Sequence, residues 1–201
     1  MNVGPELRAA IFDFDGTLVD TMPLHFEAYR RTFEELGLEL TEDDFYGNIG
    51  GRAAETIPKF LRGRSCSATI GQIHERKKAV LAEMLQTSEI IVLETAKLLP
   101  LLHQRMPMAI ASSGARPGIE LVLSRLGWLP YFQVIVTGDD VSRGKPAPDP
   151  FLFTARALGV EPSKCLVFED TDDGVAAARA AGMSVFDVRR AAAPSAFRSE
   201  R

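Results

Sequence analysis

The chain has 201 residues, of which 46% are hydrophobic and 25% charged, a composition close to that of average globular proteins, which excludes wholesale disorder. Twenty-three basic and 27 acidic residues give a formal net charge of −4, so the basic excess of a protein that coats nucleic acid or anionic lipid is missing. Two cysteines are too few for a disulfide framework and favour a reducing compartment. We therefore expect a cytoplasmic protein without a secretory signal or a membrane span.

The first part of the chain combines one strand with a long helical segment. The apolar run at 8–13 predicts a buried strand that ends at Asp13. From residue 22 to about 88 the apolar residues follow a helical period only. Helices are expected to begin near Pro23 and Thr41 and to cover 52–61 and 68–86.

From residue 94 onward, predicted helices and strands alternate. Helices are expected at 94–104, 117–126, 150–158 and 172–181, and strands at 108–112, 134–137, 165–169 and 184–188. Such alternation implies right-handed crossovers and a parallel sheet. With the first strand added, we predict a Rossmann-like, doubly wound α/β fold of about five parallel strands with a small all-helical insertion. The tail at 191–201 shows no pattern.

Chemically active side chains follow four of the predicted strands. In an open parallel sheet the ligand crevice lies outside the carboxyl ends of the strands, so these side chains are expected to gather there. In chain order they are Asp13, Asp15 and Thr17, then Ser112 and Ser113, then Lys145, then Glu169, Asp170 and Asp173. Each alone has an ordinary explanation as a turn, a loop or a helix cap. Together, the carboxylates repel one another unless a divalent cation lies among them.

The residue types indicate phosphoryl chemistry with a carboxylate nucleophile. Oxygen donors, few carboxylates and room for water favour Mg2+ over Ca2+. Asp13 needs no activating base, because an ordinary Asp is ionised at pH 7. Asp15, two residues further on, is suited to protonate a leaving alcohol and later to deprotonate the attacking water. The P-loop pattern GxxxxGK[ST] is absent after every predicted strand.

Four segments resemble, in order and spacing, the motifs of the haloacid dehalogenase-like hydrolase superfamily. They are DFDGTLVD at 13–20, ASSG at 111–114, GKPAPDPF at 144–151 and FEDTDDGVAAARAAGM at 168–183. Within the superfamily the chain is similar to the beta-phosphoglucomutase-like branch of sugar-phosphate phosphatases, nearest to the fructose-1-phosphatase type. The resemblance covers nearly the whole chain.

This resemblance implies a role for each core residue. Asp13 would be the nucleophile and a metal ligand, and Asp15 the acid/base, whose backbone carbonyl also binds the metal. Asp170 would ligate Mg2+, and Glu169 would orient Lys145, with Asp173 in a less direct supporting position. The expected phosphate-binding residues are Thr17, Ser112, Ser113 and Lys145.

The resemblance also implies two domains, a catalytic core of 1–19 and 92–201 and a helical cap of 20–91. The cap would close over the site from hinges near 19–21 and 88–94. Expected substrate contacts are His25, Arg52, Lys77 and Arg116. His25 is equally well explained as an ordinary helix residue. Arg52 is preferred over Lys77, because the basic run of Arg76, Lys77 and Lys78 is typical of a solvated helix face.

Departures from the mutase pattern favour hydrolysis over phosphoryl transfer. The mutase carries a lysine just before the cap arginine and polar residues after the motif serine, whereas here Asn48 to Gly51 and Gly114 to Arg116 stand there. Asp15 and Asp170 argue against dehalogenation, and the missing cap lysine argues against phosphonoacetaldehyde hydrolysis. We predict a monomeric, Mg2+-dependent phosphatase that acts on a small phosphorylated sugar or sugar acid through an aspartyl-phosphate. The alternatives are a hexose phosphate mutase and a non-catalytic binding protein on the same scaffold.

Overall fold

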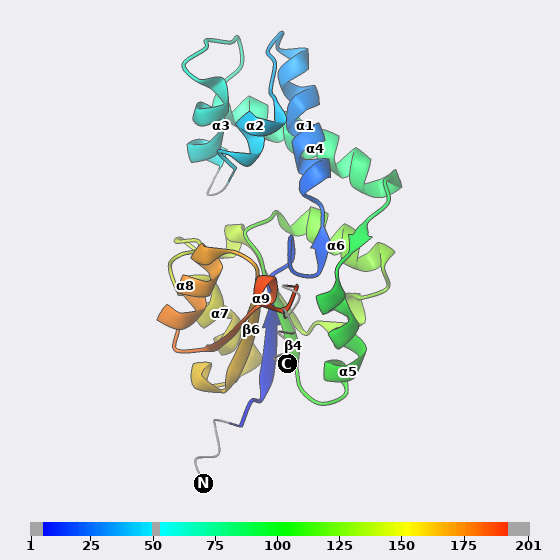
Figure 1. The fold of residues 1–201 in the computed structure, drawn as a ribbon, viewed down its shortest axis with the longest axis vertical. Coiled ribbons are helices and arrows are strands. Elements are labelled where there is room, and N and C mark those ends of the chain that lie inside the picture. The colour runs from blue at the N-terminus through cyan, green and yellow to red at the C-terminus, as the bar shows by residue number, and fades with distance from the viewer. Residues whose placement is uncertain (1–5, 50–52, 193–201) are drawn as a thin grey trace, which may run out of the picture.

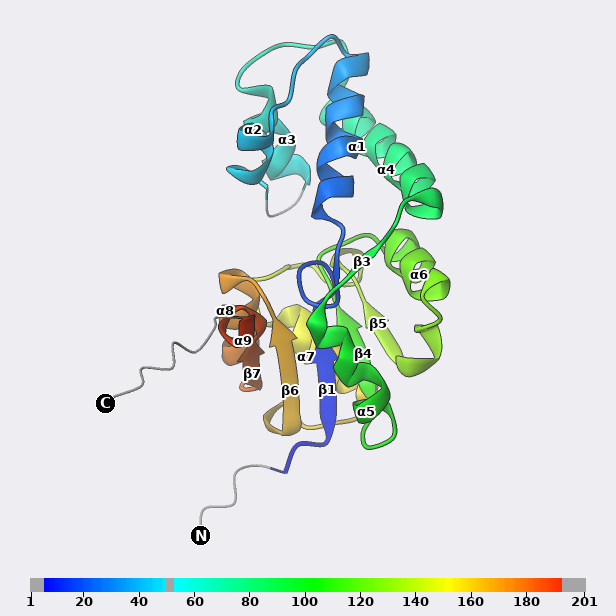
Figure 2. The same ribbon diagram turned by 45° about the vertical axis from the view of Figure 1, so that its right-hand side comes forward.

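The computed structural model describes residues 6–49 and 53–192, and its centre is a five-stranded parallel sheet (Figures 1 and 2). The strand order is β5-β4-β1-β6-β7. The strands are β1 (Ala9–Phe12), β4 (Met108–Ala111), β5 (Val134–Val136), β6 (Cys165–Glu169) and β7 (Ser184–Asp187). The predicted parallel α/β fold is therefore confirmed, and β1 lies at its centre.

Helices cover both faces of the sheet. The helices are α5 (Leu99–His103), α6 (Arg116–Arg125), α7 (Asp149–Leu158), α8 (Asp172–Ala180) and α9 (Val188–Ala192). Short 3-10 turns lie at Glu94–Leu98, Leu129–Tyr131, Gly138–Asp140 and Pro162–Lys164. Ala10 and Phe12 of β1 pack in the cluster that includes α6, whereas Ala9 and Ile11 pack with α7 and α8. This two-residue alternation buries β1 on both faces.

A helical lobe lies above the carboxyl ends of the strands (Figure 1). It contains α1 (Met22–Glu35), α2 (Glu42–Tyr46), α3 (Ala53–Leu61) and α4 (Ile70–Thr87). Phe33, Phe45, Ile57 and Phe60 belong to its own buried hydrophobic cluster. The chain enters and leaves the lobe through a two-stranded antiparallel ribbon of β2 (Val19–Asp20) and β3 (Ile91–Val92), which the sequence patterns did not predict.

The predicted helix 94–104 is divided into a 3-10 turn and α5. Pro100 explains the division, because it has no N–H to donate to the carbonyl of Ala96 four residues earlier. The Ala96 carbonyl instead accepts a hydrogen bond from the backbone N–H of Leu99, which is the 3-10 spacing. The tail at 191–201, for which the sequence showed no pattern, begins inside a helix, because α9 reaches Ala192. Residues 193–201 lie outside the described part of the chain. Across the described residues, no helix is long and apolar enough to cross a bilayer.

Helix α4 connects the lobe to the sheet domain. Its Ile73 packs in the cluster of the lobe, whereas Leu81 and Leu85 pack with Ile119 and Val122 of α6. The side chain of Arg125 donates hydrogen bonds to the carbonyls of Leu85 and Ser88 at the end of α4. The two ends of one helix therefore belong to two different hydrophobic clusters.

Candidate active site

The centre of the site is Lys145, which holds two carboxylates together. Its Nζ atom donates to Oδ1 of Asp13 and to Oε1 of Glu169, at 2.6 Å in both cases, and all three side chains are buried. Burial raises the pKa of Asp13, and the Lys145 ammonium opposes that rise. Burial alone would lower the pKa of Lys145, but Asp13 and Glu169 outweigh it and raise that pKa. Lys145 therefore stays charged.

Asp13 stands directly after β1 with one carboxylate oxygen available. Its backbone N–H donates to the carbonyl of Phe168 at 2.9 Å, which continues the ladder between β1 and β6 and fixes its position. Lys145 takes Oδ1, and no other described residue donates a hydrogen bond to Oδ2. An ionised Asp13 therefore presents one free oxygen, as a nucleophile or a metal ligand requires.

Glu169 is fixed from three directions. Its Oε1 accepts from Lys145, and its Oε2 accepts from the backbone N–H of Thr171 at 2.7 Å and from the Thr171 hydroxyl at 2.9 Å. A Cβ atom on Gly174 would lie 1.8 Å from Oε1, so only glycine fits there. The sequence motif did not single out Thr171, which caps α8 through Gly174 and holds Glu169 with the same hydroxyl.

Asp170 reaches the loop after β1 because Gly16 leaves room for it. Gly16 has a φ of +89°, and a Cβ atom built there would lie 2.1 Å from Oδ2 of Asp170. The hydroxyl of Thr17 donates to Oδ1 of Asp170 at 3.1 Å. Thr17, expected as a phosphate ligand, thus contacts a carboxylate in this structure. Burial and the neighbouring Glu169 raise the pKa of Asp170.

Asp15 is paired with Thr21, which directly precedes α1. The hydroxyl of Thr21 donates to Oδ1 of Asp15, and the Thr21 side chain makes no capping bond to α1. Burial raises the pKa of Asp15, while the Thr21 hydrogen bond and the Lys77 charge oppose the rise. A raised pKa suits a carboxyl group that must first give and then take a proton.

The remaining expected core residues differ in their surroundings. Ser112 is buried, and its Oγ atom accepts from the backbone N–H of Gly114 at 3.0 Å, which leaves its proton for a phosphate oxygen. Ser113 and Asp173 are exposed. Arg116 donates to the Ile135 carbonyl and to Asp140, both at 2.8 Å, and forms no hydrogen bond or ion pair with Asp13, Asp15 or Ser112 within the described chain.

Lys77 is buried under the helical lobe, and the expectation of a solvated face is wrong for it. Only 6% of the residue is exposed, its Nζ atom lies 3.2 Å from Nδ1 of His25, and it sits 4.8 Å from the centre of the Tyr29 ring. The helical period explains this, because Lys77 shares a face of α4 with the buried Ile73 and Leu81. Arg52, preferred from the sequence, lies outside the described residues.

The pKa values of Lys77 and His25 are both lowered. Burial lowers the pKa of Lys77 to about 8, although the Asp15 charge opposes the change. Burial and the Lys77 charge lower the pKa of His25 to about 3, so its imidazole is neutral at pH 7. The Lys77 ammonium therefore donates to Nδ1 of His25, and its charge also acts on Asp15.

The donor set fits Mg2+. Asp13, Glu169 and Asp170 place three carboxylates beside the one ammonium of Lys145, so the ionised cluster needs further positive charge. Among the described residues, no three His, Cys, Asp or Glu side chains are grouped to hold a metal. The expected set needs only two, Asp13 and Asp170, with the Asp15 carbonyl as a third donor. Mg2+ characteristically takes one or two carboxylates and completes its shell with water and phosphate oxygens.

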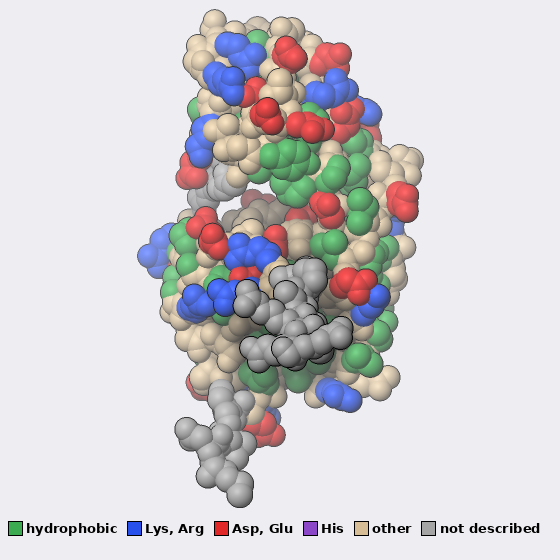
Figure 3. Space-filling model, in the orientation of Figure 1, with side chains coloured by type: hydrophobic (Ala, Val, Ile, Leu, Met, Phe, Trp, Pro, Cys, Tyr) green, Lys and Arg blue, Asp and Glu red, His purple; other side chains and the backbone are tan. Residues whose placement is uncertain are grey.

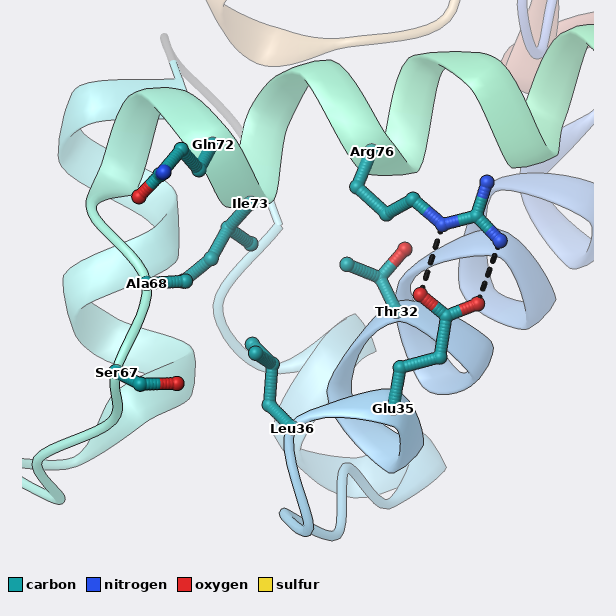
Figure 4. A pocket seen from close by; sticks show the side chains of 8 residues that line it. All are labelled: Thr32, Glu35, Leu36, Ser67, Ala68, Gln72, Ile73 and Arg76. Carbon is teal, nitrogen blue, oxygen red and sulfur yellow. Dashed lines mark hydrogen bonds and ion pairs between the residues drawn. The ribbon is translucent and has the colours of Figure 1, made fainter.

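A pocket on the outer side of the helical lobe is chemically different (Figure 4). It lies between α1 and α4, and its two charged side chains bind each other. Arg76 donates to both carboxylate oxygens of Glu35, at 2.7 and 2.6 Å. The pair leaves no free cation for a phosphate among the lining residues.

The chain is similar to known proteins over most of its length. The family described as haloacid dehalogenase-like hydrolase matches residues 10–188. The chain belongs to this family of hydrolases. The expected enzyme class, a phosphoric monoester hydrolase, is thereby confirmed, together with the family resemblance read from the four motifs.

Two curated relatives of this hydrolase are named as phosphatases. Fructose-1-phosphate phosphatase YqaB of Escherichia coli is 36% identical over 89% of this chain and 95% of its own length. A phosphorylated carbohydrates phosphatase of Thermotoga maritima is 37% identical over 88% of this chain and 82% of its own length. Among solved structures, CbbY from Rhodobacter sphaeroides in complex with phosphate has a TM-score of 0.81 and 28% identity, covering 89% of this chain and 84% of its own.

Proposed function

We propose that this hydrolase is a Mg2+-dependent phosphatase that acts on a small phosphorylated sugar or sugar acid through an aspartyl-phosphate on Asp13. The observation that carries the proposal is the free Oδ2 atom of Asp13 beside Lys145, which Glu169 and Thr171 hold in place. The names of the two phosphatase relatives support the substrate class.

In the first step, Oδ2 of Asp13 attacks the phosphorus atom, and the bond between phosphorus and the ester oxygen breaks. Asp15 gives its proton to that oxygen, so the sugar leaves as a neutral alcohol. The Lys145 ammonium and the Ser112 hydroxyl bind phosphoryl oxygens and stabilise their charge. Mg2+, when bound, supplies the positive charge that lets an anionic nucleophile approach a phosphate dianion.

In the second step, a water molecule attacks the phosphorus of the aspartyl-phosphate. Asp15, now ionised, takes the proton of this water, and the bond between phosphorus and Asp13 breaks. Inorganic phosphate and the ionised Asp13 result, and Asp15 is again protonated. The hydrogen bond from Thr21 holds the Asp15 carboxyl group for both transfers.

The helical lobe is proposed as a cap. We assign residues 20–91 to it and residues 1–19 and 92–201 to the catalytic core, with the β2–β3 ribbon as the connection. Lys77 of α4 and His25 of α1 contact each other, the Lys77 charge acts on Asp15, and both are proposed to face the leaving group. Closure would exclude water from the phosphoryl group. A cytoplasmic location and a monomeric state stay predictions.

The contacts of Arg116 support hydrolysis over mutase chemistry. A mutase holds a second phosphate while it returns the first to another hydroxyl of the same sugar. Arg116 is the first residue of α6, directly after the loop that follows the motif serine, and its guanidinium is occupied by Asp140 and Glu120. A second phosphate would have to compete with these two carboxylates.

Turnover of 4-nitrophenyl phosphate tests the proposal. Asp13→Asn removes the nucleophile and is expected to lower kcat by at least about a thousandfold while the protein stays folded. Asp172→Asn is the matched control, because Asp172 is an exposed carboxylate at the beginning of α8 and the variant is expected to keep full activity. Removal of the metal with a chelator should abolish turnover, and Mg2+ should restore it. Activity that survives either treatment would refute the proposal.

A further inference from the structure

Tyr46 is an exposed aromatic side chain on the helical lobe. It is the last residue of α2, 49% of it is exposed, and no other aromatic residue among the described part of α1 to α4 is exposed to a comparable degree. Its ring packs edge-on against Phe45, with centroids 5.0 Å apart and an interplanar angle of 83°. Phe45 is fully buried, so the Tyr46 ring has a fixed base and a surface open to solvent.

The surroundings of Tyr46 place it at the end of the lobe that faces the catalytic residues. Its ring centroid lies 6.3 Å from that of Phe26, and the two rings are inclined by 33°. Phe26 follows His25 near the beginning of α1, and Thr21, which binds Asp15, directly precedes that helix. Figure 3 shows a hollow between the two lobes with hydrophobic side chains of the upper lobe beside it.

The charges around Tyr46 agree with this position. Burial raises its pKa, and Asp20 and Glu42 add to the rise, so the hydroxyl lies within the field of Asp20 on β2. Asp20 belongs to the ribbon through which the chain enters the lobe, five residues after Asp15. Tyr46 therefore lies near both Phe26 and the ribbon that connects the lobes.

We propose that the open face of Tyr46 is a stacking platform for the ring of a cyclic sugar phosphate. A sugar ring has one face of C–H groups, which packs on an aromatic ring, and a polar rim of hydroxyls, which stays free for hydrogen bonds. The ring of Tyr46 is held by Phe45 and Phe26, so binding costs little side-chain entropy. The inference rests on the proposed phosphatase function and adds that the substrate is bound in its ring form.

Two substrates with the same carbon number separate stacking from general binding. Glucose 6-phosphate is largely cyclic, whereas sorbitol 6-phosphate is its open-chain alcohol, and acetyl phosphate reports phosphoryl chemistry without a sugar. Tyr46→Ala is expected to raise KM for glucose 6-phosphate about tenfold and to leave kcat within about twofold. KM for sorbitol 6-phosphate and turnover of acetyl phosphate should change less than about twofold. Phe153→Ala, at an exposed aromatic residue on α7, is the matched control.

Two further variants keep the test decisive if Tyr46→Ala disturbs the lobe. Tyr46→Phe keeps the ring and should keep the wild-type KM for glucose 6-phosphate. Tyr46→Leu keeps apolar volume without an aromatic face and should show most of the rise in KM. If Tyr46→Ala changes KM equally for the cyclic and the open-chain substrate, or changes neither KM, the stacking proposal is wrong. In that case, turnover of acetyl phosphate by the wild-type protein still supports the phosphatase function. If the wild-type protein does not hydrolyse acetyl phosphate at all, the phosphatase function itself is refuted.

Discussion

Lys77 and His25 come from two different helices and meet with Nζ 3.2 Å from Nδ1, although 52 residues separate them in the chain. The neutral imidazole accepts a hydrogen bond from a buried ammonium, and the ring of Tyr29 lies 4.8 Å from the same nitrogen. Asp15 is the carboxyl group whose charge acts on this ammonium. The pair thus links the helical lobe electrostatically to the proposed acid/base.

Lys77→Met is expected to stabilise the protein and to lower its activity. Burial lowers the pKa of Lys77 from 10.5 to about 8, so the folded state holds its charge at a cost of about 1 to 3 kcal/mol at pH 7. Because this pKa is lowered on folding, wild-type stability rises between pH 8 and pH 10.5, and the advantage of the variant should disappear over that range. Urea unfolding of both proteins at several pH values measures this difference in stability.

Lys59→Met, at an exposed lysine of α3, is the control for Lys77→Met and should change neither stability nor turnover. Turnover of 4-nitrophenyl phosphate should fall in the Lys77 variant alone. A Lys77 variant that is less stable than the wild type at pH 7 would show that the contacts with His25 and Tyr29 outweigh the cost of burial.

Thr21→Val should move the pH dependence of the first chemical step. The Thr21 hydroxyl lowers the pKa of Asp15 by its hydrogen bond to the ionised form, so its loss raises that pKa further. Protonation of the leaving group needs Asp15 in its acid form, and the alkaline limb of kcat/KM should therefore shift to higher pH. Thr87→Val at the end of α4 is a control outside the site. A shift to lower pH would contradict the assigned role of Asp15.

Glu169→Gln should destabilise the protein although it is nearly isosteric. Both oxygens of Glu169 accept hydrogen bonds, from Lys145 on one side and from Thr171 on the other. A glutamine amide turns one of these acceptors into a donor that faces another donor, which costs about 2 to 3 kcal/mol. Denaturant unfolding should show this loss, and kcat should fall because Lys145 loses its alignment. Glu161→Gln, at an exposed position, should leave both unchanged.

Arg125→Ala should loosen the end of α4. The Arg125 guanidinium binds the carbonyls of Leu85 and Ser88, which have no partner within their own helix end. We expect a loss of about 1 kcal/mol in stability and faster amide hydrogen exchange at residues 85–93. Exchange in the strands of the sheet should stay as in the wild type. Arg105→Ala, at an exposed arginine, is the control, and equal protection of 85–93 in both variants would contradict the proposed anchoring.

Most of the architecture followed from local patterns. Apolar runs that alternate with helical periods located every strand of the five-stranded sheet, and the motifs at the strand ends located the site. The β2–β3 ribbon was missed, because two residues per strand carry no detectable period. Thr171 was missed because it reads as an ordinary helix cap, which it also is.

Chain connectivity explains why the core of the site was predictable and its cover was not. Asp13, Lys145, Glu169 and Asp170 follow parallel strands, and the carboxyl ends of parallel strands meet at one edge wherever such a sheet forms. The meeting of Lys77 with His25 depends on how α1 and α4 cross, and the hydrogen bond from Thr21 depends on how the ribbon turns. Both are set by packing between distant segments, and the burial that shifts the pKa values of these groups arises from the same packing.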